Sequence, residues 1–261
     1  MSSSISILGC GWLGRPLANQ FLNLGYEVKG STTSIDKLEI LKSEGVYPYL
    51  IHIEELSSEV KSFLNSETLI VNITSKNVCA FANLIALIRE SQVRNVLLIS
   101  STSVYDPANY IITEETDTNK SPLARIEKYF LKENKFNTTV LRFGGLFGYD
   151  RQPGRFFKNG NMVTDPDGYV NYIHRDDCIE IIAQIVRNNV WSEVFNGVTD
   201  THPTKKEFYT YMAQIIGKEP PKFGRNTSSH FKLVSNEKLK NILNYKFKLA
   251  DLMSYQQEIT V

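Results

Sequence analysis

The chain has 261 residues, a length that suits one domain with an attached lobe better than two full domains. Its 29 basic and 28 acidic side chains give a net charge of +1, which excludes a basic field for nucleic acid and a polybasic patch for membranes. No apolar run is long enough to span a bilayer, and the first residues lack the basic start of a signal peptide. We therefore expect a cytoplasmic protein, in keeping with three irregularly spaced cysteines, Cys10, Cys79 and Cys178.

A glycine pattern near the N-terminus is the most informative feature. An apolar strand starting at Ile5 runs into G-x-G-x-x-G spacing, and an amphipathic helix follows. In this context the first glycine permits a tight turn, the second lets the backbone approach a pyrophosphate, and the third allows close helix packing. The helix N-terminus adds free N–H groups and a partial positive charge. The pattern predicts a dinucleotide site, with a turn that binds nothing as the alternative; the predicted contacts are Gly9, Gly11, Trp12, Leu13 and Gly14.

Strand-like and helix-like segments alternate through the first two-thirds of the chain. Further strands are predicted at 26–30, 46–53, 69–73, 96–99 and 139–143. Helices are predicted at 35–43, 57–64 and 78–91, and another begins at Ser121-Pro122. Continuous apolar strands between helices indicate a parallel sheet that is covered on both faces. Right-handed crossovers then give an α/β fold with a doubly wound parallel sheet.

The pattern loosens after Gly144. Residues 149–168 are rich in Gly, Pro, Asp, Asn and Arg and are predicted to form an irregular loop. A helix is predicted at 177–187, and Thr204 with Glu207 forms a capping box before a helix that ends at about 216. The last predicted helix covers 236–243.

The end of the second predicted strand bears on the choice of cofactor. An acidic side chain there would hold the ribose of NAD and repel the 2′-phosphate of NADP. Ser31, Thr32 and Thr33 offer hydroxyls instead, and Lys37 adds a cation. The sequence thus favours NADP(H) over NAD(H), while the missing arginine for a 2′-phosphate keeps NAD open. Two further cofactor contacts are expected after the fourth and fifth strands, at Thr74 and Ser100.

Six segments in order resemble the extended short-chain dehydrogenase/reductase superfamily, also called the NAD-dependent epimerase/dehydratase family. They begin at 7, 97, 141, 170, 194 and 235 and read ILGCGWLG, LLISSTSVYD, LRFGGLFG, VNYIHRDDCIEII, VFNGVTDTHPTKKEF and SNEKLKNILNYKF. The resemblance implies a Rossmann domain, expected over 1–149 and about 170–197. It also implies a small C-terminal α/β substrate lobe, expected over about 150–169 and 198–261, and a nucleotide-sugar or related carbonyl/alcohol substrate.

The family's proton-transfer pair, a tyrosine followed four residues later by a lysine, is missing from this sequence. Its Ser/Thr falls on Ser101 or Thr102, but none of the 13 tyrosines is followed four residues later by lysine. The tyrosine position falls on Leu123 or near Asn119. Without a neighbouring cation, a phenol with a pKa of about 10 is no base at neutral pH. The chain therefore resembles an atypical branch of the superfamily.

Other side chains are candidates for the chemistry. Tyr105 follows the serine-rich turn and is predicted to point its hydroxyl into the cleft, while His174 with Asp177 offers an imidazole and a carboxylate at a helix start. The alternative for His174 is a structural residue beside a helix cap. Arg125, Arg151 and Arg155 are candidate substrate ligands, with solvated surface charge as the alternative. The four histidines, His52, His174, His202 and His230, lie far apart, so no metal site is predicted.

Two functions remain open. The favoured one is an NAD(P)-dependent oxidoreductase or epimerase-like enzyme with atypical acid/base residues. The other is a non-catalytic NADP(H)-binding or redox-sensing protein of the same fold. In either case the expected partners are a dinucleotide and a small molecule, without nucleic acid or membrane, and the expected state is a monomer or homodimer.

Overall fold

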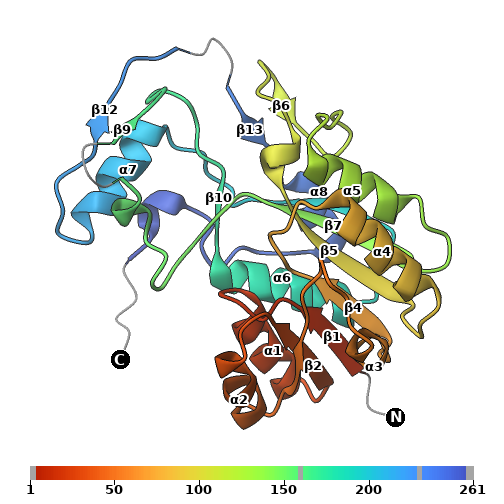
Figure 1. The fold of residues 1–261 in the computed structure, drawn as a ribbon. Helices are drawn as coiled ribbons and strands as arrows, with labels where there is room; N and C mark the ends of the chain where they lie inside the picture. The colour runs from red at the N-terminus through yellow and green to blue at the C-terminus, as the bar shows by residue number, and fades with distance from the viewer. Residues whose placement is uncertain (1–3, 158–160, 228–230, 257–261) are drawn as a thin grey trace. The chain divides into compact units, whose positions relative to one another are not determined.

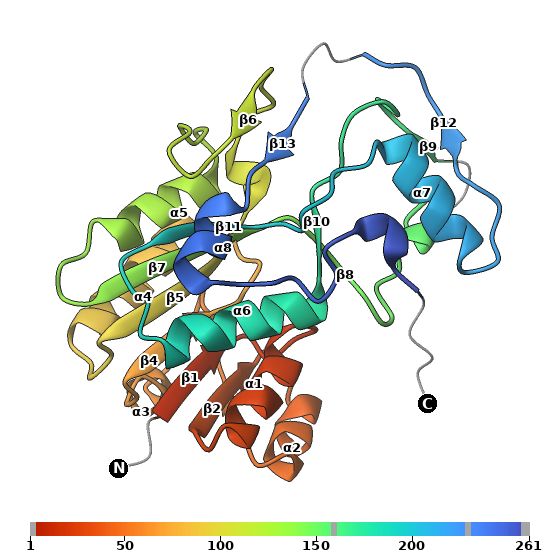
Figure 2. The same cartoon turned by 180° about the vertical axis from the view of Figure 1, so that it is seen from behind.

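The computed structural model describes residues 4–157, 161–227 and 231–256 (Figures 1 and 2). His230 and residues 158–160 of the predicted loop lie outside these ranges. The first strands and helices are β1 (Ser4–Leu8), α1 (Gly14–Asn23), β2 (Glu27–Thr32), α2 (Asp36–Ser43), β3 (Tyr47–Leu50), α3 (Glu59–Phe63), β4 (Thr68–Val71), α4 (Val78–Arg89) and β5 (Asn95–Ser101). The next are η1 (Thr102–Val104), β6 (Ile111–Ile112), α5 (Pro122–Leu131), β7 (Asn137–Phe143), β8 (Gly145–Phe147), η2 (Pro153–Arg155), β9 (Met162–Val163) and β10 (Tyr172–His174). The last are α6 (Arg175–Arg187), β11 (Val194–Gly197), α7 (Lys205–Gln214), β12 (Lys222–Phe223), β13 (Leu233–Val234), α8 (Glu237–Leu243) and η3 (Leu252–Ser254).

Seven strands form the central sheet in the order β11-β7-β5-β4-β1-β2-β3. β1 pairs in parallel with β2 on one side and with β4 on the other, and β3 and β5 extend these pairs in parallel. The predicted α/β class with a doubly wound parallel sheet is therefore confirmed. The chain runs outward from β1 to β3 and then returns to β4, so the strand order reverses between β1 and β4. In such sheets, ligands bind beyond the carboxyl ends of the strands at this switch point.

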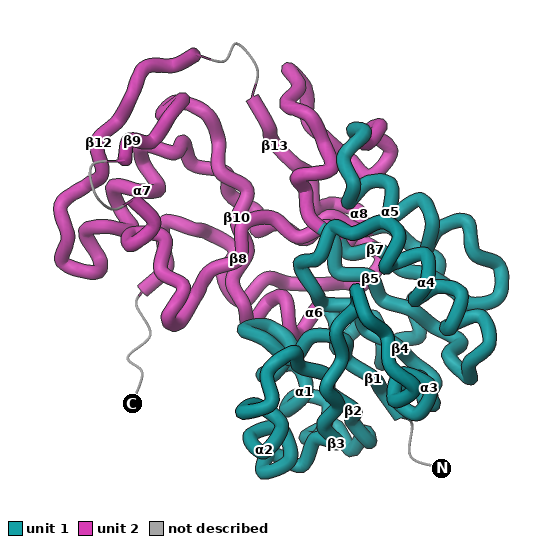
Figure 3. Tube along the Cα trace, in the orientation of Figure 1, with its two compact units in different colours: residues 1–100, 119–141, 182–194 teal, residues 101–118, 142–181, 195–261 magenta. Residues whose placement is uncertain are grey.

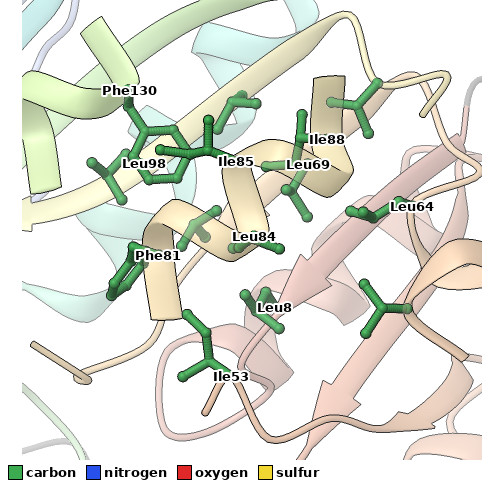
Figure 4. Close-up of a cluster of buried hydrophobic side chains, with 14 of the residues drawn as sticks. Leu8, Ile53, Leu64, Leu69, Phe81, Leu84, Ile85, Ile88, Leu98 and Phe130 are labelled. Carbon is green, nitrogen blue, oxygen red and sulfur yellow. The ribbon is translucent and has the colours of Figure 1, made fainter. Parts of the chain in front are cut away.

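One face of the sheet packs against α4. Strand side chains such as Leu8, Leu69 and Leu98 meet Leu84 and Ile88 of the helix in one buried cluster, drawn in Figure 4. Because successive side chains of a strand point to opposite faces, Ile5 and Ile7 face the other side of the sheet. These residues are fully or almost fully buried. The continuous apolar strands follow from burial on both faces.

The caps of two later helices were predicted correctly. Ser121 precedes the proline that starts α5, and its hydroxyl accepts the N–H of Ala124. Thr204 and Glu207 form the expected reciprocal capping box at the start of α7. None of the described helices combines the length and apolar character needed to cross a membrane.

The chain divides into two compact units, coloured separately in Figure 3. Unit 1 contains residues 1–100, 119–141 and 182–194, and unit 2 contains 101–118, 142–181 and 195–261. Unit 2 has its own core, which includes Phe147, Phe208 and Met212.

These bounds differ from the expected domains, because 101–118, 142–149, 170–181 and 195–197 group with the later chain. The residues after β5 and β7 bond to distant segments of unit 2. The N–H of Ala108 donates to Phe231 O at 2.8 Å, and that of Gly145 to Asn171 O at 2.7 Å.

Candidate functional site

The three glycines of the β1–α1 loop, all in unit 1, have distinct environments. Gly9 has φ +103°, and a Cβ there would lie 2.3 Å from Asn72 O. A Cβ on Gly14 would lie 2.1 Å from Gly9 O. Gly11 is exposed, and a Cβ there would meet nothing within 4 Å. Two of the glycines thus permit close packing of the protein, and Gly11 leaves open space above the backbone.

Two side chains fix the loop from neighbouring strands. Ser31 Oγ of β2 accepts the N–H of Gly9 at 2.9 Å, and Asn72 Nδ2, just after β4, donates to Gly9 O at 3.0 Å. The N–H of Cys10 donates to Ser31 O at 2.7 Å. Burial raises the pKa of the Cys10 thiol to about 12, so the thiol stays protonated at neutral pH. Cys10 therefore acts as a packed small side chain and not as a reactive thiol.

Helix α1 begins without a side-chain cap. Leu13 occupies the N-cap position and makes no side-chain capping hydrogen bond, and the first turn of the helix carries no acidic residue. The N–H of Arg15 donates to Gly11 O at 3.1 Å, and Pro16 has no N–H. The first N–H groups of a helix have no partner within the helix and attract anions. The Leu13 side chain itself is buried, so any contact it makes with an anion comes from its backbone. Trp12 is half-buried beside Gly11 in sequence.

A dinucleotide fits this loop. The open surface at Gly11, the uncapped start of α1 and the absence of acidic residues in its first turn match what a diphosphate requires. The backbones of Gly11, Trp12 and Leu13 would face the diphosphate, and Gly9 and Gly14 shape the turn that presents them. This loop is also at the switch point of the sheet.

The residues expected at the ribose have different roles. The Ser31 side chain is buried and its hydroxyl accepts the N–H of Gly9, so a cofactor contact by this side chain stays a prediction. Thr32 is buried as well, and its Oγ1 accepts the N–H of Ser34 at 3.2 Å. Thr33 and Lys37 are exposed and remain candidates for a 2′-phosphate. Thr74, after β4, is exposed.

Ser100, expected to contact the cofactor, is buried at the end of β5. Its Oγ donates to Glu127 Oε1 of α5 at 2.5 Å, and Glu127 is 1% exposed. Sequence reasoning missed this buried pair, although the helix pattern contained a signal. Glu127 stands in the apolar stripe formed by Leu123, Ile126 and Phe130, at the spacing of residues that share one helix face.

In unit 2, the turn after β5 carries the family's Ser/Thr. The half-buried Ser101 caps η1, where its Oγ accepts the N–H of Ser103 at 3.1 Å. Thr102 is buried. Of the two candidates, Ser101 is the more exposed residue.

Tyr105 is fully buried, in contrast to the expectation that its hydroxyl points into a cleft. Its hydroxyl donates to Asn196 Oδ1 at 2.9 Å and accepts from Arg142 Nη1 at 2.5 Å. The Arg142 guanidinium carbon also lies 4.9 Å from the centre of the tyrosine ring. Burial raises the pKa of the Tyr105 hydroxyl despite the guanidinium beside it. The phenol is therefore protonated at neutral pH, and Arg142 is its buried structural partner.

His174 and Asp177 do not form the predicted pair. The buried His174 accepts the N–H of Asp176 through Nδ1 at 3.3 Å, and its ring stacks on Tyr149. Asp177 is fully buried, and its carboxylate accepts a hydrogen bond from the hydroxyl of Tyr245 at 2.7 Å. It also accepts the backbone N–H groups of Lys248 and Leu249. The carboxylate is committed to the C-terminal segment, which no local pattern in the sequence could reveal.

The candidate substrate arginines are all exposed. Arg125 lies on α5 in unit 1. In unit 2, Arg151 precedes η2 and Arg155 is the last residue of η2. Within the ranges that the structure describes, no group of three or more His, Cys, Asp or Glu side chains could hold a metal ion.

Comparison with known proteins identifies relatives of this chain in sequence and in fold. The protein YeeZ of Escherichia coli (strain K12) is 29% identical over 266 residues, covering 95% of this chain and 96% of YeeZ. Two solved structures share the fold at low identity. MoeE5 in complex with UDP-glucose and NAD has a TM-score of 0.78 at 17% identity, covering 97% of both chains. Human SDR39U1 with NADPH has a TM-score of 0.70 at 14% identity, covering 96% of both chains.

The sequence model of one family matches residues 5–196, most of the chain. Its description, NAD dependent epimerase/dehydratase family, agrees with the glycine loop and with the sheet built around it. This chain belongs to the NAD dependent epimerase/dehydratase family.

Proposed function

We propose that this protein binds NADP(H) at the β1–α1 loop and acts on a nucleotide-sugar or small carbonyl/alcohol substrate as an oxidoreductase or epimerase-like enzyme. The observation that carries the proposal is the contrast between Gly11, which is open, and its neighbours Gly9 and Gly14, which are enclosed. A loop kept free of side chains above an uncapped helix start suits a diphosphate. The ligands of MoeE5, UDP-glucose and NAD, supply the substrate class by analogy of fold.

The preference for NADP(H) rests on the residues after β2. Ser31 and Thr32 are committed to the protein, so Thr33 and Lys37 are the exposed groups that would meet a 2′-phosphate. A hydroxyl and an ammonium stabilise a phosphate, and β2 ends without the carboxylate that would repel it. NADPH in human SDR39U1 is consistent with this choice, and NAD in MoeE5 is the alternative.

The chain's own residues would supply the proton chemistry in an unusual way. A bound nicotinamide nucleotide supplies hydride transfer. Ser101 accepts the N–H of Ser103 and can still donate its own proton to a substrate oxygen. Tyr105 is buried and protonated, so we assign it a structural role, in which its hydroxyl bonds to Asn196 and Arg142. Among the predicted groups, Ser101 is the best placed to orient a carbonyl.

A second candidate is a non-catalytic NADP(H)-binding or redox-sensing protein. The observation in its favour is Glu127, which occupies the inner face of α5 and pairs with Ser100. α5 is the helix on which the family's Tyr/Lys pair is expected, and it carries the buried Glu127 carboxylate and no such pair. Under both candidates we propose a cytoplasmic location, because the free thiols of Cys10, Cys79 and Cys178 suit a reducing compartment. We also propose that the protein is a monomer or a homodimer.

The test begins with titrations of NADPH and NADH, using calorimetry and the fluorescence of Trp12 in the loop. Binding of NADPH at least about tenfold tighter than NADH supports the cofactor proposal. Hydride transfer is then measured with a panel of nucleotide sugars and small carbonyls. Loss of turnover in Ser101→Ala with unchanged NADPH affinity supports the enzyme. Tight NADPH binding without turnover across the panel favours the binding protein, and no binding of either nucleotide refutes both.

A further inference from the structure

A lysine from the C-terminal part of the chain contacts the turn that carries Ser101. Lys232 Nζ donates to Tyr105 O at 2.5 Å and to Thr102 O at 3.2 Å, across 127 and 130 residues of sequence. Both carbonyls belong to the turn formed by η1 and its following residue. A charge-assisted hydrogen bond is about twice as strong as a neutral one, so this contact fixes both carbonyls at once.

The backbone around Lys232 is itself held in place. Asn171 Nδ2 donates to Lys232 O at 2.9 Å, and its Oδ1 accepts the N–H of Val234 at 2.9 Å. On either side, Phe231 O accepts from Ala108, and β13 pairs in parallel with β6. The ammonium therefore projects from an anchored segment, and its position on the turn is defined.

The electrostatic setting also favours a defined position. Burial lowers the pKa of Lys232, while the nearby Asp106 carboxylate raises it. Thr102 begins η1 and Tyr105 follows it, so the ammonium contacts carbonyls at both ends of this short turn. Since an ammonium has three donors and two are used here, the cation keeps a further N–H.

We propose that Lys232 is a positioning residue of the site described under the proposed function. It holds the Ser101–Tyr105 turn so that Ser101 Oγ accepts from Ser103 and presents its proton outward. The C-terminal segment thereby supplies a cation to the turn that carries Ser101, in a chain that lacks the family's Tyr/Lys pair. The effect on catalysis rests on the proposed function, whereas the hold on the turn does not.

The test measures amide hydrogen exchange at Ser103 and Tyr105 by NMR. Lys232→Met is expected to speed exchange at both amides by about tenfold or more, as loss of a charge-assisted hydrogen bond predicts. Lys232→Arg is expected to restore protection, because the guanidinium keeps the charge and the donors. Lys206→Met, which removes an exposed lysine of the same unit, is the control and should leave both amides unchanged.

The outcomes separate the proposal from a general loss of stability. Unchanged exchange at Ser103 in a folded Lys232→Met overturns the proposal. If that variant does not fold, Lys232→Gln, whose neutral amide keeps two N–H donors without charge, is measured in its place. If both variants unfold while Lys206→Met folds, Lys232 serves global stability and the positioning role is refuted.

NADPH titration of the same variants distinguishes this proposal from the proposed function. Lys232→Met should keep the wild-type NADPH affinity, because the glycine loop belongs to unit 1. On a substrate identified by the panel, the variant should lower kcat, leave KM for the dinucleotide unchanged, and recover with arginine. If wild-type protein binds no nucleotide, the proposed function fails, and the exchange data still decide whether Lys232 holds the turn.

Discussion

Replacing Gly11 by alanine should separate cofactor binding from folding. A Cβ at Gly11 meets open space, and its backbone lies outside the left-handed region. An alanine there fits the folded state and reduces the entropy of the unfolded chain. That change is worth about 0.4–1 kcal/mol in favour of the fold. We therefore expect Gly11→Ala to keep or slightly raise Tm.

The same methyl group should weaken dinucleotide binding. It occupies the space that the diphosphate would need and prevents close approach to the backbone N–H groups. Loss of one charge-assisted hydrogen bond costs about 1.5–3 kcal/mol, which corresponds to a roughly tenfold to hundredfold higher Kd for NADPH. Stability and affinity should thus change independently.

Gly9→Ala provides the matched comparison within the same loop. Its φ of +103° and the 2.3 Å approach to Asn72 O strain the folded state, whether or not a ligand binds. We expect a loss of about 2 kcal/mol or more, hence a Tm lower by roughly 4 °C or more. Calorimetric titration and thermal scans on both variants check the pair. A Gly11→Ala protein that binds NADPH as tightly as wild type would refute the placement of the diphosphate.

Three further predictions concern buried or half-buried polar groups. Ser31→Ala should destabilise the protein by about 1–2 kcal/mol in urea titrations, because the N–H of Gly9 loses its acceptor, without changing the NADPH/NADH ratio; a changed ratio would return Ser31 to the cofactor site. Glu127→Ala should cost about 2 kcal/mol or more, since the buried Ser100 hydroxyl loses its acceptor, and an unchanged urea midpoint would contradict this. Burial lowers the pKa of His202 in the folded protein. Below about pH 6.5 the unfolded chain therefore binds more protons than the folded one, and the free energy of unfolding decreases as the pH is lowered. Urea titrations of His202→Gln between pH 5 and 7.5 should show a shallower decline than wild type, and equal slopes would argue against this role.

The central fold followed from local patterns in the sequence. Apolar strands between amphipathic helices predicted the parallel sheet, because strands buried on both faces need apolar residues throughout. The caps at Ser121 and Thr204 were predictable, since a cap is a short-range hydrogen bond between residues three apart. The two-residue strands β6, β9, β12 and β13 escaped prediction, as two residues are too few to display a period.

For the site, the sequence determined the loop and the tertiary structure decided what each polar side chain does. The glycine spacing is a local backbone requirement, so the roles of Gly9, Gly11 and Gly14 could be read directly. Whether Ser31 meets a ligand or the N–H of Gly9 depends on a contact across 22 residues. The hold of Lys232 on the turn spans 127 residues or more. Such partners are chosen by the packing of distant segments, and no pattern within a single helix or strand records that choice.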